Sequence, residues 1–334
     1  MILFEYPFIV RALLAALFTG LAAPAIGTYL VQRRLALMGD GIGHVAVTGV
    51  ALGLLTSTSP TVTAVVVAVI GAVVIELIRT RGRTSGDVAL ALLFYGGIAG
   101  GVLITGIAGQ SAATLNTYLF GSITTISGTD VWVTVVLAAT VLVLALGLSP
   151  QLFTVAQDEE FAKVAGLNVR FYNLLVSVMA AVTVTVAMRT VGLLLVSALM
   201  VVPVAAAQQL TRGFRVTLSL AMVIGILASL GGVTVSAYVD AAPGATIVLL
   251  ALVVFAAAWP VGVWVRRRQR LAVPFTDQPL STEELAAGHT AVPERHEHEH
   301  GEACGHRAVP HGDHVDYVHD GHRHAVHGSH YDEH

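Results

Sequence analysis

The sequence predicts a polytopic, all-α membrane protein with a hydrophilic C-terminal tail. The 334 residues are 55% hydrophobic and 12% charged, with a mean hydropathy of +0.77. A soluble domain carries about 25% charged residues, roughly twice this share. Apolar runs follow one another up to residue 265, whereas 13 of the 14 histidines lie after residue 288. We therefore expect a membrane domain over residues 1–265 and a separate tail over residues 266–334.

Nine apolar stretches approach the length of about 20 residues that a membrane-spanning helix needs. Several are rich in Gly, Ala and Thr, which let helices approach closely, so we expect a tight bundle. Pro203 lies within the seventh stretch and is expected to kink or end it. The nine predicted spans are residues 8–30, 36–55, 60–78, 86–108, 130–148, 171–188, 191–210, 216–238 and 244–265.

The basic residues predict the orientation in a plasma (inner) membrane. If the clusters face the cytoplasm, the spans alternate consistently, with the N-terminus outside and the C-terminal tail inside. Arg189 is the exception, on the outer side. No basic region precedes the first apolar run, so this run is expected to be a retained span rather than a cleaved signal. The inner clusters are Arg33/Arg34, Arg79/Arg81/Arg83, Lys163/Arg170, Arg212/Arg215 and Arg266–Arg268 with Arg270.

Asp40 and His44 are the candidate metal ligands of the membrane domain. His44 is the only histidine in the first 288 residues. Residues four apart share one face of a helix, with Cβ atoms about 5–6 Å apart. A carboxylate and an imidazole together suit a divalent transition metal ion. An ionisable residue within a span is costly, which favours a functional role. The alternative is that Asp40 is a helix N-cap and His44 a packed polar residue.

The stretch DEEFAKVAGL, residues 158–167, predicts a short amphipathic helix on the inner side of the membrane. Gly166 stands where a glycine usually ends a helix. Such a helix suits contact with a soluble partner. The alternative is an ordinary connector with an acidic start.

The tail alternates histidines with acidic residues, which is typical of metal binding. Zn²⁺, Ni²⁺ and Cu²⁺ all bind imidazole, so the tract does not select one metal. Such a composition predicts disorder, because it cannot form an apolar core. The alternative is a pH-sensitive tail without a metal role. The candidate tail ligands are His296, His298, His300, His311, His314, His319, His322 and His324.

Several functions are unsupported by the sequence. The only lysine, Lys163, follows an alanine, so no P-loop is present and ATP hydrolysis requires a separate protein. The protein is therefore expected not to be an enzyme and to hold no permanent cofactor. The single cysteine, Cys304, excludes an intrachain disulfide. The arginines after residue 265 are expected to anchor the last span, and no nucleic acid partner is expected.

Five motifs, in this order, resemble the membrane permeases of zinc and manganese ABC importers, the ABC-3 type. Together they extend over nearly the whole membrane domain, and their order is more specific than any one of them. They are RRLALMGDGIGH (33–44), NTYLFGS (116–122), DEEFAKVAGL (158–167), RTVGLLLVSALMVVP (189–203) and DAAPGA (240–245).

The resemblance implies a type II ABC importer fold, similar to the vitamin B12 and ferric-siderophore permeases. It implies a homodimer, a separate ATPase subunit and an extracellular or periplasmic metal-binding protein that delivers the ion. The family's intramembrane metal site corresponds to Asp40 and His44, and its coupling helix to the stretch around Glu160, Ala162 and Gly166. The transported ion is then zinc first and manganese second, and the histidine-rich tail favours zinc.

Two other functions stay open. A proton-coupled zinc exporter would carry several His/Asp pairs on different spans, whereas this sequence has one. A membrane-anchored metal buffer or sensor would bind metal through the tail alone, but nine spans exceed what an anchor needs.

Overall fold

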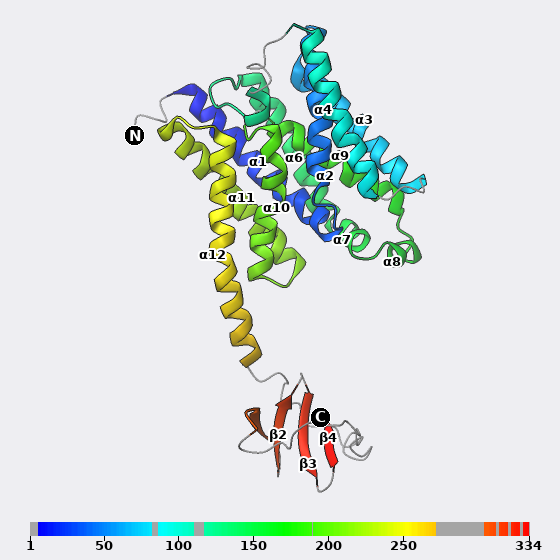
Figure 1. Cartoon of the computed structure of the whole chain (residues 1–334), viewed down its shortest axis with the longest axis vertical. Coiled ribbons are helices and arrows are strands. Elements are labelled where there is room, and N and C mark those ends of the chain that lie inside the picture. The colour runs from blue at the N-terminus through cyan, green and yellow to red at the C-terminus, as the bar shows by residue number, and fades with distance from the viewer. Residues whose placement is uncertain are drawn as a thin grey trace. The chain divides into compact units, whose positions relative to one another are not determined.

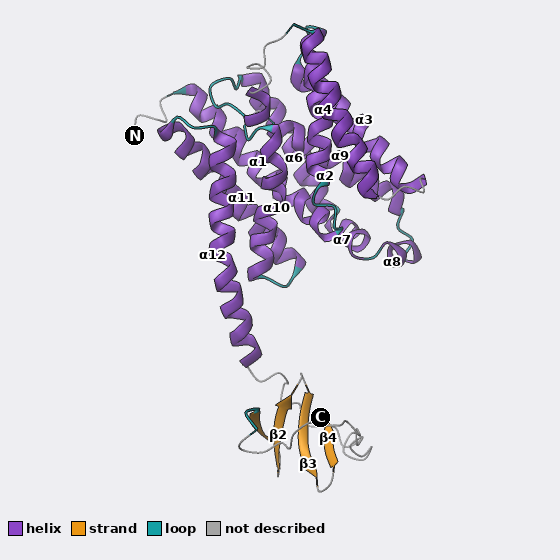
Figure 2. Cartoon of the chain, in the orientation of Figure 1, coloured by secondary structure: helices purple, strands orange, loops and turns teal. Residues whose placement is uncertain are grey.

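The protein, described here by a computed structural model, forms two compact units, Met1–Trp264 and Val265–His334. The first unit is helical and the second contains a small sheet (Figures 1 and 2). The structure describes residues 6–81, 86–109, 117–188, 190–271, 304–311, 314–319, 322–327 and 330–333.

The helices follow the order of the apolar runs. Two short helices, α7 and α8, stand between the longer ones, and α8 occupies the stretch for which a short amphipathic helix is predicted. The helices are α1 (Pro7–Gln32), α2 (Met38–Leu55), α3 (Pro60–Arg81), α4 (Gly86–Ile107), α6 (Gly128–Gly147), α7 (Ser149–Gln157), α8 (Glu159–Val164), α9 (Val169–Ala187), α10 (Leu193–Leu210), α11 (Phe214–Val239) and α12 (Pro243–Leu271).

Within the described residues, eight helices are long and apolar enough to cross a membrane. The predicted span 191–210 corresponds to α10 (Leu193–Leu210), which has the same 18 residues as α2. It begins two residues later than predicted, because Gly192, with a φ of +86°, has a conformation outside the helical region. The prediction of a polytopic, all-α membrane domain is therefore confirmed, and α10 brings the eight helices to the predicted count of nine.

Pro203 does not end α10, which continues to Leu210. Of the two predicted effects of this proline, a kink or an end of the helix, the end does not occur. Two further helices also contain an internal proline, Pro24 in α1 and Pro260 in α12. Neighbouring helices and local backbone adjustment can replace the missing backbone hydrogen bond inside a membrane bundle.

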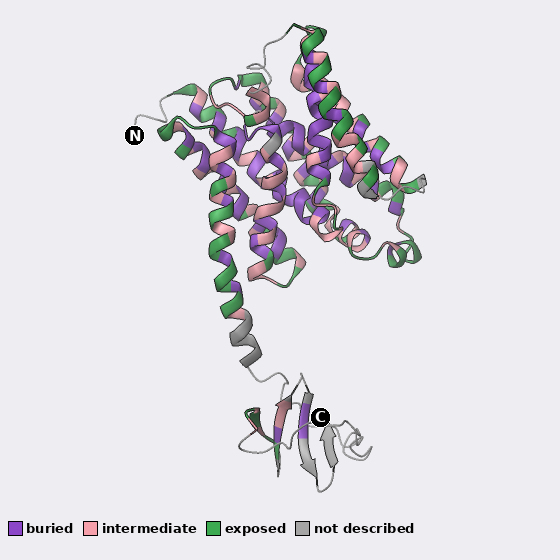
Figure 3. Cartoon of the chain, viewed as in Figure 1, coloured by how far each residue is buried: buried purple, intermediate pink, exposed green. Residues whose placement is uncertain are grey.

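Small residues bring the central helices close together, as predicted. Gly20 of α1 faces Gly225 of α11, and a Cβ atom on Gly20 would lie 2.7 Å from the carbonyl oxygen of Gly225. The buried residues gather along α1, α2, α9 and α10, whereas α4 and α12 show long exposed faces (Figure 3). These exposed faces carry large apolar side chains such as Leu92 and Val102, which suits contact with lipid.

The tail contains an antiparallel sheet in the order β1-β2-β3-β4. The expectation of disorder is wrong for these segments. Within the sheet, Asp316 is fully buried and lies 4.0 Å from Arg323 across the strand pair. The strands are β1 (Arg307–His311), β2 (His314–His319), β3 (His322–His327) and β4 (His330–Glu333).

The local sequence explains these strands. Val315, Tyr317 and Val318 are residue types that favour strands. Two residues separate each strand from the next, and one of the two is always glycine. Two-residue connections with glycine are those that antiparallel hairpins prefer. The connections are Gly312-Asp313, Asp320-Gly321 and Gly328-Ser329.

Candidate metal site and polar network

The two predicted metal ligands lie in the first turns of α2. The nitrogen Nδ1 of His44 is 3.9 Å from Oδ1 of Asp40. The Asp40 side chain is 31% exposed, whereas the His44 side chain is 8% exposed. The carboxylate is therefore accessible, and the imidazole beside it is enclosed by protein.

A backbone hydrogen bond selects the tautomer of His44. Its Nδ1 lies 2.8 Å from the carbonyl oxygen of Asp40. A carbonyl oxygen only accepts, so Nδ1 is the protonated nitrogen and donates. In the neutral imidazole the lone pair then belongs to Nε2, the atom that can bind a metal ion. Holding one ring nitrogen on a carbonyl is a common way to orient a metal-binding histidine.

The bounds of α2 argue against Asp40 as a helix cap. The N-cap position is Leu37, which makes no side-chain capping bond, and Asp40 lies inside the first turn. The helix dipole favours a carboxylate there. The carboxylate is thus placed favourably without being needed to start the helix.

Helix α4 packs closely against α2 beside His44. A Cβ atom on Gly97 would lie 2.6 Å from the backbone of His44. The ring of Phe94 lies 4.0 Å from the imidazole, centroid to centroid. One turn further along α2, Thr48 donates a hydrogen bond of 2.8 Å to the carbonyl oxygen of Gly97. Phe94 is thus the contact with the imidazole ring itself, while Gly97 and Thr48 join the backbones of α2 and α4 beside it.

One protomer supplies few metal ligands. Where the structure describes the chain, no group of three or more His, Cys, Asp or Glu side chains could hold a metal ion. Zinc in proteins usually has four ligands. Asp40 and His44 can therefore provide only part of a full coordination shell.

The three residues predicted to couple to an ATPase lie in different environments around α8. Glu160 and Gly166 are exposed, whereas Ala162 is completely buried against Val155 and Val169. Asp158 caps α8, and its Oδ1 accepts hydrogen bonds from the backbone of Glu160 and of Phe161. The helix therefore rests on Ala162 and presents its other faces outward.

Gly166 ends this helix, as its position in the sequence predicts. Its φ is +81°, a left-handed conformation that favours glycine. The backbone N–H of Leu167 donates to the carbonyl oxygen of Ala162, and that of Gly166 to the carbonyl oxygen of Lys163. This pair of bonds is the Schellman motif of helix C-termini.

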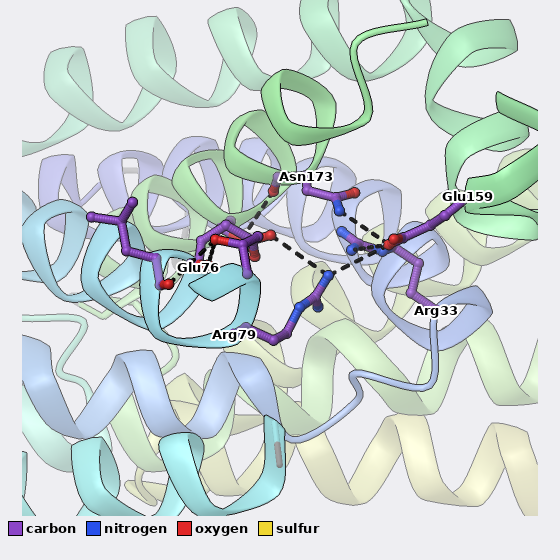
Figure 4. A network of polar contacts seen from close by, with 8 residues as sticks. Arg33, Glu76, Arg79, Glu159 and Asn173 are labelled. Atoms are coloured by element: carbon purple, nitrogen blue, oxygen red, sulfur yellow. Dashed lines mark hydrogen bonds and ion pairs between the residues drawn. The ribbon is translucent and has the colours of Figure 1, made fainter. Parts of the chain in front are cut away.

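Glu159, the first residue of α8, connects α8 to three other segments (Figure 4). Its Oε1 accepts hydrogen bonds from Arg33, which follows α1, at 3.2 Å and from Asn173 of α9 at 3.0 Å. Arg79 of α3 forms an ion pair with the same oxygen at 3.5 Å. Segments far apart in the sequence thus meet at one carboxylate.

The network continues to the buried Glu76 on α3. Arg79 lies 3.6 Å from Oε1 of Glu76, and Ser177 of α9 donates a hydrogen bond of 3.3 Å to its Oε2. Figure 4 shows Arg79 between the two carboxylates of Glu76 and Glu159. We call Arg33, Glu76, Arg79, Glu159 and Asn173 the polar network.

The arginine side of the network is strongly buried. The Arg33 side chain is 4% exposed, and burial together with the charge of Arg79 lowers the pKa of its guanidinium. A cavity of about 550 Å³ adjoins it. This cavity is lined by Gln32, Arg33, Arg34, Arg79, Gln157 and Glu159, among others.

Sequence reasoning did not find the polar network. It interpreted Arg33 and Arg79 only as members of inner basic clusters. Glu159 and Arg33 are 126 residues apart, so no local spacing reveals their contact. The sequence offered one signal of such a network, because only a few charged residues flank the apolar spans. Each of them needs a partner, so they can be expected to contact one another.

The structure places the tail histidines differently from one another. His296, His298 and His300 lie outside the described residues. The backbones of His311, His314, His319 and His322 lie at strand ends, and His324 is a buried residue of β3.

The bundle of long apolar helices defines a polytopic membrane protein. The family model of the ABC 3 transport family matches residues 5–261. The chain therefore belongs to this family.

Curated relatives carry related names. The chain is 34% identical to "Manganese transport system membrane protein MntC" of Halalkalibacterium halodurans, over 77% of this chain and 88% of the relative. It is 27% identical to "High-affinity zinc uptake system membrane protein ZnuB" of Haemophilus influenzae, over 73% of this chain and 94% of the relative.

A solved structure shares the fold. "PsaBC from Streptococcus pneumoniae in complex with Fab" matches with a TM-score of 0.72 and 29% identity, over 80% of this chain and 97% of the matched chain. The match confirms the predicted permease fold of the membrane domain.

Proposed function

We propose that this chain is the permease subunit of an ATP-driven importer that carries a divalent transition metal ion across the plasma membrane. The observation that carries the proposal is the placement of Asp40 and His44 on one face of α2 in a member of the ABC 3 transport family. The names of the relatives, which refer to manganese and zinc transport, support the choice of substrate.

Asp40 and His44 are the transient ligands of the transported ion in this proposal. His44 offers Nε2, because Nδ1 is engaged by the carbonyl oxygen of Asp40. In a homodimer with a central pathway, two copies supply two carboxylates and two imidazoles, which completes a four-ligand shell. A transport site must also release its ion, so partial coordination by each subunit suits the task.

Helix α8 is the docking element for a separate ATPase subunit. Phe161 and Val164 are 62% and 88% exposed on this short helix, although both are apolar. Glu160 and Gly166 lie on the exposed side, and the buried Ala162 sets the helix against the bundle. Glu159 links the helix to α1, α3 and α9, so a displacement of α8 reaches the spans beside α2.

The remaining partners follow from this arrangement. A metal-binding protein delivers the ion from the outer side, where the N-terminus lies. The tail and α8 then share the cytoplasmic side with the basic clusters.

Zinc is the first candidate for the ion and manganese the second. Imidazole is a good zinc ligand, while carboxylates suit manganese, and the site combines the two. The histidine-rich tail adds weight to zinc. The alternative functions, a proton-coupled exporter or a metal buffer, find less support, because within the described residues Asp40 and His44 form the one acid–imidazole pair of the first unit.

Metal uptake in cells that lack the protein tests the proposal. Cells expressing wild type, Asp40→Ala, His44→Ala or the double variant are grown under metal limitation, and cell zinc and manganese are measured by mass spectrometry. We expect each variant to lower uptake at least about tenfold, because even indirect support of a metal ligand is worth that much.

Thr48→Val is the matched control. Thr48 lies one turn beyond His44 on the same face of α2, and its hydroxyl bonds to Gly97 rather than facing a metal. Metal uptake by cells that express Thr48→Val should remain near that of wild-type cells. Unchanged uptake in the double variant, with equal amounts of protein in the membrane, would show that Asp40 and His44 are not the ligands.

A further inference from the structure

The cavity beside the polar network has the size and the lining of a site for a small polar ligand. Its volume of about 550 Å³ lies in the range of about 300–1,000 Å³ that small-molecule sites have. Most of the side chains that line it are charged or carry an amide. We call it the arginine cavity, and its polar lining consists of Gln32, Arg33, Arg34, Arg79, Gln157 and Glu159.

Positive charge exceeds negative charge around the arginine cavity. Arg33 and Arg79 share one oxygen of Glu159, Oε1, at 3.2 and 3.5 Å. Arg79 has a second carboxylate in Glu76. Arg34 forms no ion pair with any residue that the structure describes. Three guanidinium groups thus stand against two carboxylates, and the excess charge attracts anions.

Arg33 is a buried donor with unused hydrogen-bonding capacity. Its side chain is 4% exposed, and its Nη2 donates to Glu159. Its Nη1 is buried and has no hydrogen-bond partner among the described residues. A buried donor without an acceptor is unfavourable, and more so when it belongs to a charged group. An anion with several oxygens would supply both the missing acceptor and a counter-charge.

Arg34 adds an accessible donor to the buried one. It is exposed, and its φ of +59° lies in the left-handed region, which is uncommon for a residue other than glycine. Backbone conformations of this kind gather at ligand-binding sites. Two consecutive arginines, Arg33 and Arg34, therefore line one cavity in the connection between α1 and α2.

The arginine cavity lies at the ends of apolar spans. Arg33 directly follows α1, and Arg79 belongs to the last turn of α3. Lipid headgroups lie at this depth, just outside the hydrocarbon core. In the proposed orientation these ends face the cytoplasm, and basic pockets between helices on that side bind anionic headgroups. The position therefore favours phosphate as the anion.

We propose that the arginine cavity binds an anionic phosphate group through Arg33, Arg34 and Arg79, supplied by a phospholipid headgroup or by a soluble phosphate. The planar guanidinium suits phosphate, because it donates two parallel hydrogen bonds. A small rotation of Arg33 toward the cavity brings Nη1 to the bound phosphate. The site goes beyond the proposed function, and binding there stands whether or not the chain transports metal.

Thermal unfolding of the full-length protein in detergent tests the proposal. One arm adds inorganic phosphate at constant ionic strength, with chloride as the reference, because salt alone screens charges. The other arm adds phosphatidylglycerol to the micelles, with the neutral phosphatidylcholine as the reference, and native mass spectrometry counts the lipids that stay bound. We expect a rise in Tm with ligand concentration, because a ligand that binds the folded state stabilises it.

Arg34→Gln is the test variant, because Arg34 has no ion pair whose loss could disturb the fold. Its affinity for the ligand should fall at least about tenfold, the usual effect of removing a hydrogen bond to a charged group. Arg34→Lys keeps the charge without the planar fork and should lose less. Arg215→Gln is the matched control, since Arg215 is another exposed arginine and does not line the cavity.

The outcomes are distinct. A rise in Tm that Arg34→Gln weakens and Arg215→Gln keeps supports the site. A response to phosphatidylglycerol alone identifies a lipid headgroup as the source, whereas a response to inorganic phosphate that also displaces the lipid identifies a soluble phosphate. No response in either arm, or equal losses in Arg34→Gln and Arg215→Gln, would overturn the proposal. None of these results depends on metal uptake, so a failure of the transport proposal leaves this test intact.

Discussion

His44 is constrained from three sides. Its Nδ1 donates to the backbone of Asp40, the ring of Phe94 lies against it, and Gly97 brings the backbone of α4 to its carbonyl group. The hydrogen bond and the contact with Phe94 restrict the ring without engaging Nε2, and Gly97 restricts the backbone that carries it. The environment therefore orients a single free nitrogen, which is what a site for a transported ion requires.

Gly97→Ala should displace α4 from α2. The new Cβ atom would lie 2.6 Å from the backbone of His44 and of Val45, where neither side can yield without moving a helix. We expect a loss of about 1–3 kcal/mol in the free energy of unfolding, the usual cost of overpacking. Thermal unfolding in detergent and metal uptake measure the effect.

Gly96→Ala is the matched control for this prediction. Gly96 is exposed on the same helix, and a Cβ atom there would meet nothing within 4 Å. Its stability should equal or slightly exceed that of wild type, because alanine favours helix. If both variants behave alike, the close approach of α4 to His44 does not limit stability.

At the scale of elements, α8 is held at its beginning and exposed beyond it. Glu159 binds Arg33 and Asn173, and Ala162 packs into the bundle. Phe161 and Val164 remain outside. A short helix of six residues is not stable on its own. Its position therefore depends on these contacts and on the cap formed by Asp158.

Glu159→Ala should loosen α8 and weaken the link to the spans. The variant leaves the strongly buried Arg33 without its acceptor, which typically costs about 1–3 kcal/mol. The cost is expected at the lower end, because Glu159 itself is 43% exposed. Thermal unfolding and ATP-driven uptake measure the two effects.

Glu160→Ala is the matched control, because it removes a glutamate side chain from the next residue, which is exposed. It should leave stability unchanged, and any loss of uptake would then reflect contact with the ATPase rather than the polar network. Equal stability of both variants would contradict the structural role of Glu159.

At the scale of the whole molecule, the chain consists of two units with different chemistry. The first unit buries apolar and small side chains between helices, and the second pairs short strands rich in histidine. The core residues of the first unit all belong to that unit. The two units should therefore fold independently.

A chain that ends after Leu271, the last residue of α12, tests this independence. We expect it to reach the membrane, to unfold at the temperature of the full chain and to keep metal uptake, while its zinc binding falls. Loss of membrane insertion or of uptake would show that the tail supports the permease.

Local signals predicted much of the fold and part of the site. Apolar runs of membrane length predicted the long helices, and the spacing of Asp40 and His44 predicted their shared face. Gly166 predicted the end of α8, because a left-handed C-terminal residue is a local property. The strands of the tail were missed, since the turn signals in the tail stood within a composition typical of disorder.

The sequence by itself determined that this is an all-α membrane protein of the metal-permease type, because hydropathy, helical spacing and motif order are local properties of the chain. Only the tertiary structure decided which nitrogen of His44 is free, that Glu159 meets Arg33 and Arg79, and how the strands of the tail pair. These features join residues up to 126 positions apart. Such contacts depend on packing and strand register, which no local pattern specifies.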